Sequence, residues 1–439
     1  MKILVSNLGS TSLKWRLFDF ANGAERVLHK GGFERVTDYA QAVEDCLGQL
    51  VAAGAIAEPG ELSAVGFKTI IAKDINGCVE IDERVLQAME AYSALAPAHN
   101  PPYISGIRLF QQRVPGVPLI ALFETAFYQF APEAMMRYAV PSTWHDAGVR
   151  RWGFHGASHK FIAERSAELL GRLDVVQRAR GLYSQASSIL IARGAPPPRA
   201  AAPALEDSLS SRRLRAAPSP SAPDLRVISC HLGGSSSITG ILNGVAIGNS
   251  LGMSPQSGLP QNNRVGDLDS GAVPYVVRTL GLTIAEAERQ LTKESGLKGL
   301  SGLSNDIRDI ETAAANGDAN SQLALDVYVA SARHWIGAYL FELGGVEAIV
   351  FTAGIGENGT ALRARICANL EQLGIILDPD ANAATIGREA VISAPGSAVK
   401  ILVIPTNEEL VVAREAKRLL TAAAHQRDLA SDANVSVHH

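Results

Sequence analysis

The stretch ILVSNLGSTSLKWRLFDF, residues Ile3–Phe20, reads as two strands joined by a small-residue turn. Apolar residues recur near period two on both sides of the turn, which is typical of a half-buried hairpin. A second apolar strand followed by glycine and serine occurs much later, in LRVISCHLGGSSSI, residues Leu225–Ile238. This similarity between the two halves of the chain predicts a duplicated architecture.

The segments between these two hairpins alternate between strand and helix patterns. We expect a helix over Asp38–Ala53 and a strand over Leu119–Phe123. Alternation of this kind predicts an α/β fold. Because 439 residues exceed what one hydrophobic core usually serves, we expect two domains, 1–150 and 151–424, followed by a frayed tail, 425–439.

One stretch of the second domain differs in composition from the rest. Residues 175–223 are rich in Pro, Ala, Ser and Arg and show no strand period. Such a composition cannot bury a core, and a loop of this length is unusual inside a compact domain. We therefore predict a flexible insertion whose ends lie close together and whose removal leaves the fold intact.

The overall composition excludes several classes of protein. With 47% hydrophobic and 19% charged residues, the chain has the composition of a globular protein, and no apolar run approaches the ~18 residues of a membrane span. The N-terminus lacks the features of a secretory signal, so we expect a cytoplasmic protein. A net charge of −4 gives no general attraction to nucleic acid. The cysteines, which lack metal-ligand or disulfide spacing and are expected to be packed thiols, are Cys46, Cys78, Cys230 and Cys367.

Three small-residue turns follow apolar strands, at Asn7–Ser12, His231–Ser237 and Thr352–Asn358. Such turns expose backbone N–H groups without side-chain obstruction, which suits them to wrapping phosphates. Together they favour a nucleotide site. The Walker A pattern is absent, which disfavours a P-loop kinase, and Gly354-Ile355-Gly356 lacks the third glycine of a dinucleotide fingerprint.

Nine short motifs stand in an order that one family shares. They are SNLGSTSLKW (Ser6–Trp15), LAPAHNPP (Leu95–Pro102), FETAF (Phe123–Phe127), RRWGFHGASH (Arg150–His159), ISCHLGGSSS (Ile228–Ser237), NRVGDLD (Asn263–Asp269), SNDIRD (Ser304–Asp309), FTAGIGEN (Phe351–Asn358) and IPTNEE (Ile404–Glu409). In these motifs the chain resembles the acetate and propionate kinases, within the actin, hexokinase and Hsp70 fold group. The resemblance covers nearly the whole chain except 175–223 and the tail.

The resemblance implies a fold and a reaction. The fold is two actin-like (ribonuclease H-like) α/β domains, each with a mixed five-stranded sheet. The reaction is the reversible, direct in-line transfer of a phosphoryl group from ATP to a short-chain carboxylate such as acetate, propionate or butyrate, giving an acyl phosphate. The resemblance also implies Mg²⁺ or Mn²⁺ as cofactor, ATP or ADP and a small carboxylic acid as partners, and a homodimer. A carboxylate is already ionised near neutral pH, so catalysis needs positioning and charge stabilisation more than a strong base.

The resemblance also implies roles for individual residues. Mg²⁺, which prefers hard oxygen ligands, is positioned by Asn7 and Glu408. The catalytic set, in which cationic and donor groups stabilise the transferring phosphoryl group, is Glu124, Lys68, His155 and Arg264. The first phosphate-facing hairpin carries Ser10, Ser12 and Lys14. The nucleotide-binding residues are His231, Leu232, Gly233, Gly234, Ser235, Asp306, Ile307, Arg308, Gly354, Ile355, Gly356, Glu357 and Asn358. The acid pocket is lined by Ile70, Ala98, Phe154 and Pro255.

Several of these roles have a simpler alternative. Asn7 suits a turn, Glu408 suits the start of a solvated helix, and Asp306 with Arg308 suits an ordinary surface ion pair. A lone histidine is usually structural, although three separate motifs contribute the donors His155, His231 and Arg264.

The sequence departs from the family at several of these positions. Lys68 stands where the family has arginine, and Glu124 stands where it has aspartate. Lysine gives a point contact in place of a planar fork, so it is not an equivalent ligand. Gly234 and Ser235 replace an asparagine and a glycine of the phosphate loop, and Ile70 and Ala98 replace a valine and a leucine of the acid pocket.

Two other functions remain open at this point. One is a nucleotide-binding regulator of the same fold with weakened catalysis, which the changes at Lys68 and Glu124 suggest. The other is an interaction protein that uses the Arg- and Pro-rich run within 175–223 as a docking arm.

Overall fold

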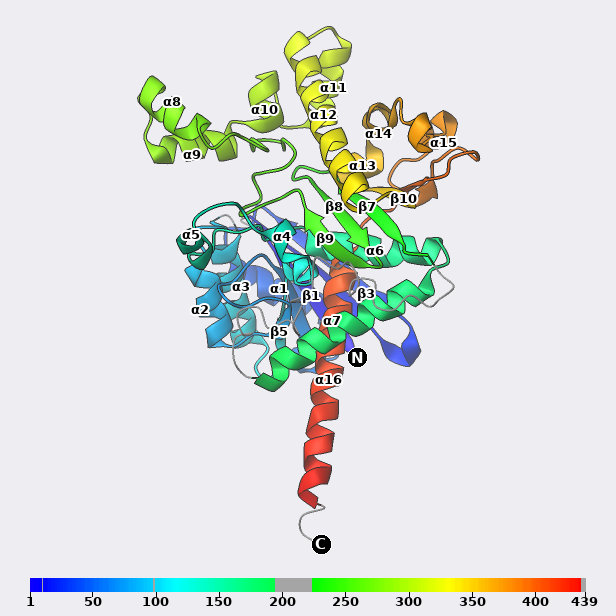
Figure 1. Cartoon of the computed structure of the whole chain (residues 1–439). Helices are drawn as coiled ribbons and strands as arrows, with labels where there is room; N and C mark the ends of the chain where they lie inside the picture. Colours follow the sequence, from blue (N-terminus) through cyan, green and yellow to red (C-terminus); the bar gives the residue numbers. More distant parts are fainter. Residues whose placement is uncertain (10, 98, 194–222, 436–439) are drawn as a thin grey trace. The chain divides into compact units, whose positions relative to one another are not determined.

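The computed structural model describes residues 1–9, 11–97, 99–193 and 223–435 (Figure 1). These residues form two compact units, the first from 1–129, 178–193 and 407–435 and the second from 130–177 and 223–406. Ser10, Ala98 and the proposed docking arm lie outside the described residues.

The first unit is built on a six-stranded mixed sheet. The central strand β1 pairs antiparallel with β2 and parallel with β4, and β4 pairs parallel with β6. In chain order the strands are β1 (Lys2–Leu8), β2 (Ser12–Asp19), β3 (Arg26–Glu34), β4 (Ala64–Thr69), β5 (Cys78–Glu80) and β6 (Leu119–Phe123), and across the sheet they run β3-β2-β1-β4-β6-β5.

The second unit repeats this sheet strand for strand. Its strands are β7 (Arg226–His231), β8 (Ser237–Leu242), β9 (Val245–Asn249), β10 (Ala348–Thr352), β11 (Ala390–Val391) and β12 (Lys400–Val403), in the order β11-β12-β10-β7-β8-β9. Here too the third strand along the chain lies at one edge, and the central pairs, β7 with β10 and β10 with β12, are parallel. The predicted hairpins, the α/β class and the duplication are confirmed.

Each sheet has six strands, where five were expected. The additional members, β5 and β11, are only three and two residues long and pair antiparallel at a sheet edge. Strands this short show no alternation that a sequence pattern could reveal.

Helices cover the sheets. The first unit holds α1 (Tyr39–Ala52), α2 (Glu83–Ala91), α3 (Asn100–Arg113) and α16 (Glu408–Val435). The second unit holds α4 (Glu133–Met136), α5 (Ser142–Asp146), α6 (Gly156–Leu169), α8 (Ala272–Leu280), α9 (Ile284–Lys293), α10 (Gly296–Ser301), α11 (Ile307–Ala315), α12 (Ala319–Glu342), α13 (Ala353–Asn358), α14 (Thr360–Cys367) and α15 (Pro379–Ala383). Helix α7 (Leu173–Arg193) contributes to both units.

Helix α1 shows how the sequence sets these elements. Asp38 caps its N-terminus by accepting a hydrogen bond from the Gln41 backbone N–H at 3.0 Å. Its buried residues, which include Val43, Cys46 and Leu50, recur at helical spacing and face the first core. The helix predicted for Asp38–Ala53 is therefore confirmed.

The domain boundaries differ from the predicted ones. The first unit ends at residue 129, whereas 150 was expected, and the chain returns to it at residue 407. The return is made by α16, which packs against β1 and β4 and carries the buried residues Val411, Val412 and Ala416. The predicted frayed tail is a continuation of α16 as far as Val435.

The predicted flexible insertion is wrong for its first part, because residues 175–193 belong to helix α7. Val175, Val176, Ala179 and Tyr183 form a buried helical face. The Tyr183 hydroxyl donates to the Phe127 carbonyl at 2.9 Å, and the two rings stack at 5.9 Å. Deleting the whole stretch would therefore strip apolar contacts from the first unit. The prediction for 194–222 lies outside the described residues.

The two ends of this stretch do lie close together, as expected. Arg172 donates to the Asp174 carboxylate at 2.9 Å and to the Pro223 carbonyl at 2.8 Å.

Two predictions from composition can also be compared with the structure. All four cysteines are buried free thiols, as expected. Among the described helices, none combines the length and the apolar character needed to cross a membrane.

Arg363 on α14 is a fully buried cation that ties three segments of the second unit together. Its guanidinium donates to the Gly356 carbonyl at 2.8 Å, to the side chain and carbonyl of Asn382 at 2.8 and 3.1 Å, and to the Thr385 carbonyl at 2.6 Å. Burial lowers its pKa. The neutral oxygens that accept these hydrogen bonds take the place of the water that would solvate the guanidinium charge at the surface.

We expect Arg363→Met to destabilise the second unit by about 3 kcal/mol, because it removes charge-assisted hydrogen bonds and leaves buried acceptors unsatisfied. For a unit of this size that loss corresponds to a fall of about 6–12 °C in melting temperature, measured by calorimetry. Arg388→Met is the control, since Arg388 is exposed and, among the described residues, donates only to the Ala384 carbonyl. Equal melting temperatures for the two variants would contradict a structural role for Arg363.

Candidate active site

In the first unit, three predicted residues form one charged cluster. Lys68 lies on β4 and Glu124 directly follows β6, so parallel pairing places both at the same edge of the sheet. The Lys68 ammonium lies 3.1 Å from the Glu124 carboxylate and also donates to the carboxylate of Glu408, the first residue of α16.

The electrostatics of this cluster keep Lys68 charged. Burial alone would lower the pKa of Lys68, but the carboxylates of Glu408 and Glu124 hold it well above its usual range. Tyr103 on α3 is buried beside the cluster, and burial raises its pKa to about 12 although Lys68 opposes the shift. The cluster therefore holds one ammonium between two carboxylates, with a neutral phenol beside it.

Asn7, near the end of β1, is the predicted metal ligand in this unit. Its amide nitrogen donates to Glu409 at 3.0 Å, and its side-chain oxygen is buried with no hydrogen-bond partner among the described residues. A buried side-chain oxygen whose amide nitrogen binds the Glu409 carboxylate suits a hard cation such as Mg²⁺. Across the described ranges, no group of three or more His, Cys, Asp or Glu residues is arranged to hold a metal, so such an ion would rely partly on substrate oxygens and water.

Lys14 does not join this cluster. It lies directly opposite Asn7 in the β1–β2 register, yet its ammonium pairs with Glu34 at 2.8 Å and its side chain is exposed. Ser12 begins β2, and Ile70 follows β4 and is half-buried. In the described part of the chain, no hydrogen bond or ion pair joins any of these three residues to the charged cluster.

In the second unit, the predicted histidines stack on one another. His155 is the N-cap residue of α6 and His231 ends β7; their ring centroids lie 4.1 Å apart with planes 19° apart. His155 has a left-handed backbone, with φ 57° and ψ 31°, which is uncommon for a residue other than glycine. His231 Nδ1 lies 2.8 Å from the Ser158 hydroxyl.

Arg264 approaches the glycine-rich loop of the same unit. Its guanidinium donates to the Gln261 side-chain oxygen and the Pro255 carbonyl, both at 3.2 Å, and to the Ser235 hydroxyl at 3.4 Å. All three acceptors are neutral, and burial lowers the pKa of Arg264. Ser235, which replaces a family glycine, therefore helps to hold this guanidinium.

The glycine-rich loop and the segment after β10 lie side by side. The Leu232 carbonyl accepts hydrogen bonds from the backbone N–H groups of Ile355 and Gly356 at 2.8 and 2.9 Å. The structure thus brings these two predicted nucleotide-binding segments together. The turn expected at Thr352–Asn358 is instead the short helix α13, held partly by the Asn358 amide donating to the Gly354 carbonyl at 2.8 Å.

The remaining nucleotide-binding candidates pair with one another. Asp306 caps α11, and Arg308 donates to it at 2.9 Å while remaining 84% exposed. The Arg308 side chain and its backbone N–H lower the pKa of Asp306 to about 2. The pair is an exposed ion pair in this structure, and its contact with a nucleotide remains a prediction.

Two predicted acid-pocket residues lie in the second unit. Phe154 is buried directly before His155, and its carbonyl accepts from Asn249 at 3.3 Å. The Pro255 carbonyl accepts from both Arg264 and Gln261. These two residues therefore lie beside the histidine and arginine groups of their own unit.

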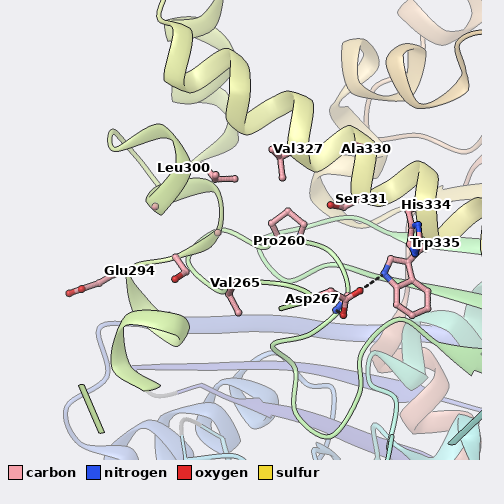
Figure 2. A pocket seen from close by; sticks show the side chains of 14 residues that line it. Pro260, Val265, Asp267, Glu294, Leu300, Val327, Ala330, Ser331, His334 and Trp335 are labelled. Atoms are coloured by element: carbon pink, nitrogen blue, oxygen red, sulfur yellow. Dashed lines mark hydrogen bonds between the residues drawn. The ribbon is translucent and has the colours of Figure 1, made fainter. Parts of the chain in front are cut away.

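A cavity of about 780 Å³ lies elsewhere in the second unit, beside α12 (Figure 2). Trp335 on its wall donates to Asp267 at 3.1 Å. Its lining also includes the carboxylate of Glu294 and apolar residues such as Val265 and Leu300. Two carboxylates disfavour a polyanionic nucleotide here, and none of the predicted site residues lines this cavity.

Sequence reasoning missed several residues that contact the site groups. Glu409 holds Asn7, and Gln261 holds Ser235 and Arg264. The serines and histidine behind His155 and His231 are Ser158, His159, Ser229 and Ser237. All of these residues except Gln261 lie within the nine motifs. The motifs therefore indicated the segments that form the site, but they did not reveal which side chains contact one another.

Comparison with known proteins gives a consistent result. The model of the Acetokinase family matches residues 29–178 and 210–414. An acetate kinase of Geobacillus kaustophilus is 37% identical over 442 residues, which cover 95% of this chain and 99% of that protein.

Solved structures agree with this match. The crystal structure of Porphyromonas gingivalis acetate kinase superposes with a TM-score of 0.77 at 32% identity, covering 95% of this chain and 99% of that one. A propionate kinase from Francisella tularensis gives 0.75 at 29% identity, covering 94% and 98%. The chain therefore belongs to the acetokinase family of phosphotransferase enzymes.

Proposed function

We propose that this protein transfers the γ-phosphoryl group of ATP to a short-chain carboxylate, reversibly and by direct in-line attack, to give an acyl phosphate. The observation that carries the proposal is the arrangement in the second unit, where stacked His155 and His231 lie beside a glycine-rich loop that Arg264 also contacts. Donors of this kind stabilise charge on a transferring phosphoryl group.

The predicted catalytic residues would have distinct roles. Lys68 and Glu124 would orient the carboxylate and the reacting oxygens, while His155, His231 and Arg264 would bind the phosphoryl oxygens. The carboxylate attacks phosphorus, the bond to the β,γ-bridging oxygen breaks, and ADP leaves with that electron pair. No proton needs to be removed from the ionised acid, so positioning supplies most of the rate enhancement.

Asn7 and Glu408 would hold Mg²⁺ or Mn²⁺, with Glu409 fixing the Asn7 amide. When bound, the ion would neutralise phosphate charge. The buried side-chain oxygen of Asn7, which no described residue hydrogen-bonds, supports this assignment.

The direct test of the function is a hydroxamate assay with acetate, propionate and butyrate. Ala98 in place of a family leucine removes more side-chain volume than Ile70 in place of valine returns. Since each buried methylene contributes up to ~0.8 kcal/mol, we expect propionate to be used at least as well as acetate, and Ala98→Leu to shift preference toward acetate. Strict preference of the unaltered enzyme for acetate would contradict the pocket assignment, and ATP binding without acyl phosphate would favour the regulator.

Lys68 and Glu124 should act as a unit, because their charged groups lie 3.1 Å apart in a largely buried site. We expect Lys68→Arg and Glu124→Asp each to lower kcat/KM, and the double variant to recover part of the loss, with a coupling of at least ~1 kcal/mol.

The matched control for this cycle is the surface pair Lys2 and Glu61 of the same unit, whose charged atoms lie 2.5 Å apart. Lys2→Arg and Glu61→Asp should leave kcat/KM unchanged, alone and together. Additive effects at Lys68 and Glu124 would show that the two substitutions are independent, and a more active Lys68→Arg enzyme would favour the regulator.

We also propose that the protein is a homodimer that associates through helices α8 and α9. No residue of α8 is buried, and Tyr275, Leu280 and Ile284 are 61%, 66% and 64% exposed. Figure 1 shows this helix pair lying apart from the strands of its own unit. Exposed apolar side chains that the described residues of their own unit leave uncovered suit a self-complementary contact with a second copy.

Replacing Tyr275 and Leu280 together by Lys should give a folded monomer by light scattering, because two buried charges would oppose association. Ile386→Lys is the control, since Ile386 is equally exposed at 61% but lies near α15. A dimer that survives the double substitution would place the interface elsewhere.

A further inference from the structure

We propose that Ser229, His159 and Ser237 form a hydrogen-bond relay that fixes His155 in the tautomer with its proton on Nε2. These three are positioning residues, and their importance for catalysis rests on the proposed role of His155 at the phosphoryl group.

The relay is a continuous chain of short contacts between α6 and the second sheet. His159 Nδ1 lies 2.8 Å from the Ser229 hydroxyl, and His159 Nε2 lies 2.8 Å from the Ser237 hydroxyl. The Ser237 hydroxyl also lies 2.8 Å from His155 Nδ1. Three contacts therefore connect Ser229 on β7 to His155.

Secondary structure places these groups together. His155 and His159 are four residues apart at the start of α6, so they lie on one face of it. Ser229 and His231 alternate along β7 and share a face of the sheet, and Ser237 on β8 lies opposite His231. The relay thus joins the first turns of α6 to the two strands that flank the glycine-rich loop.

The interior of the relay excludes water. Ser229, His159 and Ser237 are all fully buried. Burial, and then the neighbouring His231, hold the pKa of His159 well below its usual range. A neutral imidazole has one N–H donor and one bare nitrogen, so His159 donates at one end and accepts at the other.

The Ser229 hydroxyl determines in which direction the hydrogen bonds of the relay are donated. Among the described residues its hydroxyl contacts only His159 Nδ1, and a buried hydroxyl donates its proton to an available acceptor. His159 therefore accepts at Nδ1 and donates from Nε2 to Ser237. Ser237 then donates its own proton to His155 Nδ1, which leaves the ring proton of neutral His155 on Nε2.

This direction matters for the chemistry. A His155 ring with a proton on Nε2 offers a donor from that nitrogen, whereas the other tautomer offers a lone pair, which would repel an anionic oxygen. The left-handed backbone of His155 and its stacking on His231 restrain the same ring. A residue held in a sparsely populated conformation by its surroundings is often functional.

The test is the ¹⁵N spectrum of histidine-labelled full-length protein, with the His155 signals assigned from their loss in His155→Gln. At neutral pH we expect a bare nitrogen at His155 Nδ1 and a protonated one at Nε2. A protonated Nδ1 would overturn the proposal, and this measurement needs no variant of the relay itself.

Kinetics give the second readout. We expect Ser237→Ala to average the two His155 nitrogen signals and to lower kcat about tenfold, the loss expected for one orienting hydrogen bond, with the KM for nucleotide changed by less than about twofold. Ser237→Thr, which keeps the hydroxyl, should restore both. An unaltered spectrum and kcat in Ser237→Ala would overturn the relay.

Ser166→Ala is the matched control, because Ser166 on α6 is, like Ser237, a fully buried serine, but within the described ranges it donates only to the Ala163 carbonyl. It should change neither readout. The two measurements would distinguish a failure of the proposed function from a failure of the relay. A protein with the expected spectrum that forms no acyl phosphate would refute the kinase activity and leave the relay standing, whereas an active enzyme with a protonated Nδ1 would refute the relay alone.

Discussion

The parallel pairing of the central strands is the constraint on which the rest of the structure depends. Parallel neighbours end at the same edge of a sheet, so residues that follow them must come together however far apart they lie in the chain. In the first unit this rule brings Lys68 beside Glu124, and in the second it brings the loop after His231 beside α13. Because the sheet is duplicated, each unit has one such edge.

Local patterns were sufficient to predict much of this fold. The two hairpins, the helix capped by Asp38 and strand β6 are determined by residues adjacent in the sequence. Elements that depend on distant contacts could not be predicted in the same way. Helix α16 belongs to the first unit because Val412 packs against Gly66 of β4, and α7 was hidden because the Pro- and Ala-rich run that follows it in the sequence obscured the helical spacing of Val176 and Tyr183.

In the candidate site, too, local features could be predicted from the sequence and long-range contacts could not. Motifs named most of its residues, because glycine turns and isolated charges after strands are local signals. They could not reveal that Lys68 contacts Glu408 across 340 residues of sequence, or that Ser235 would hold Arg264 where the family has a glycine. A substitution that appears disruptive in the sequence can therefore have a new partner in the fold, and the longer side chain of Glu124 reaching Lys68 is one example.

The charges of the two units differ in a way that suits phosphoryl transfer. In the first unit the Lys68 ammonium is already neutralised by carboxylates, so this half is better suited to orienting than to attracting an anion. In the second unit the hydrogen bonds of Arg264 to described residues go only to neutral oxygens, and the serines beside His155 and His231 are neutral as well. A cation that no carboxylate balances keeps its attraction for an incoming anion, and partial burial strengthens that attraction. The second unit is therefore the better suited of the two to attract an anion such as a phosphate group.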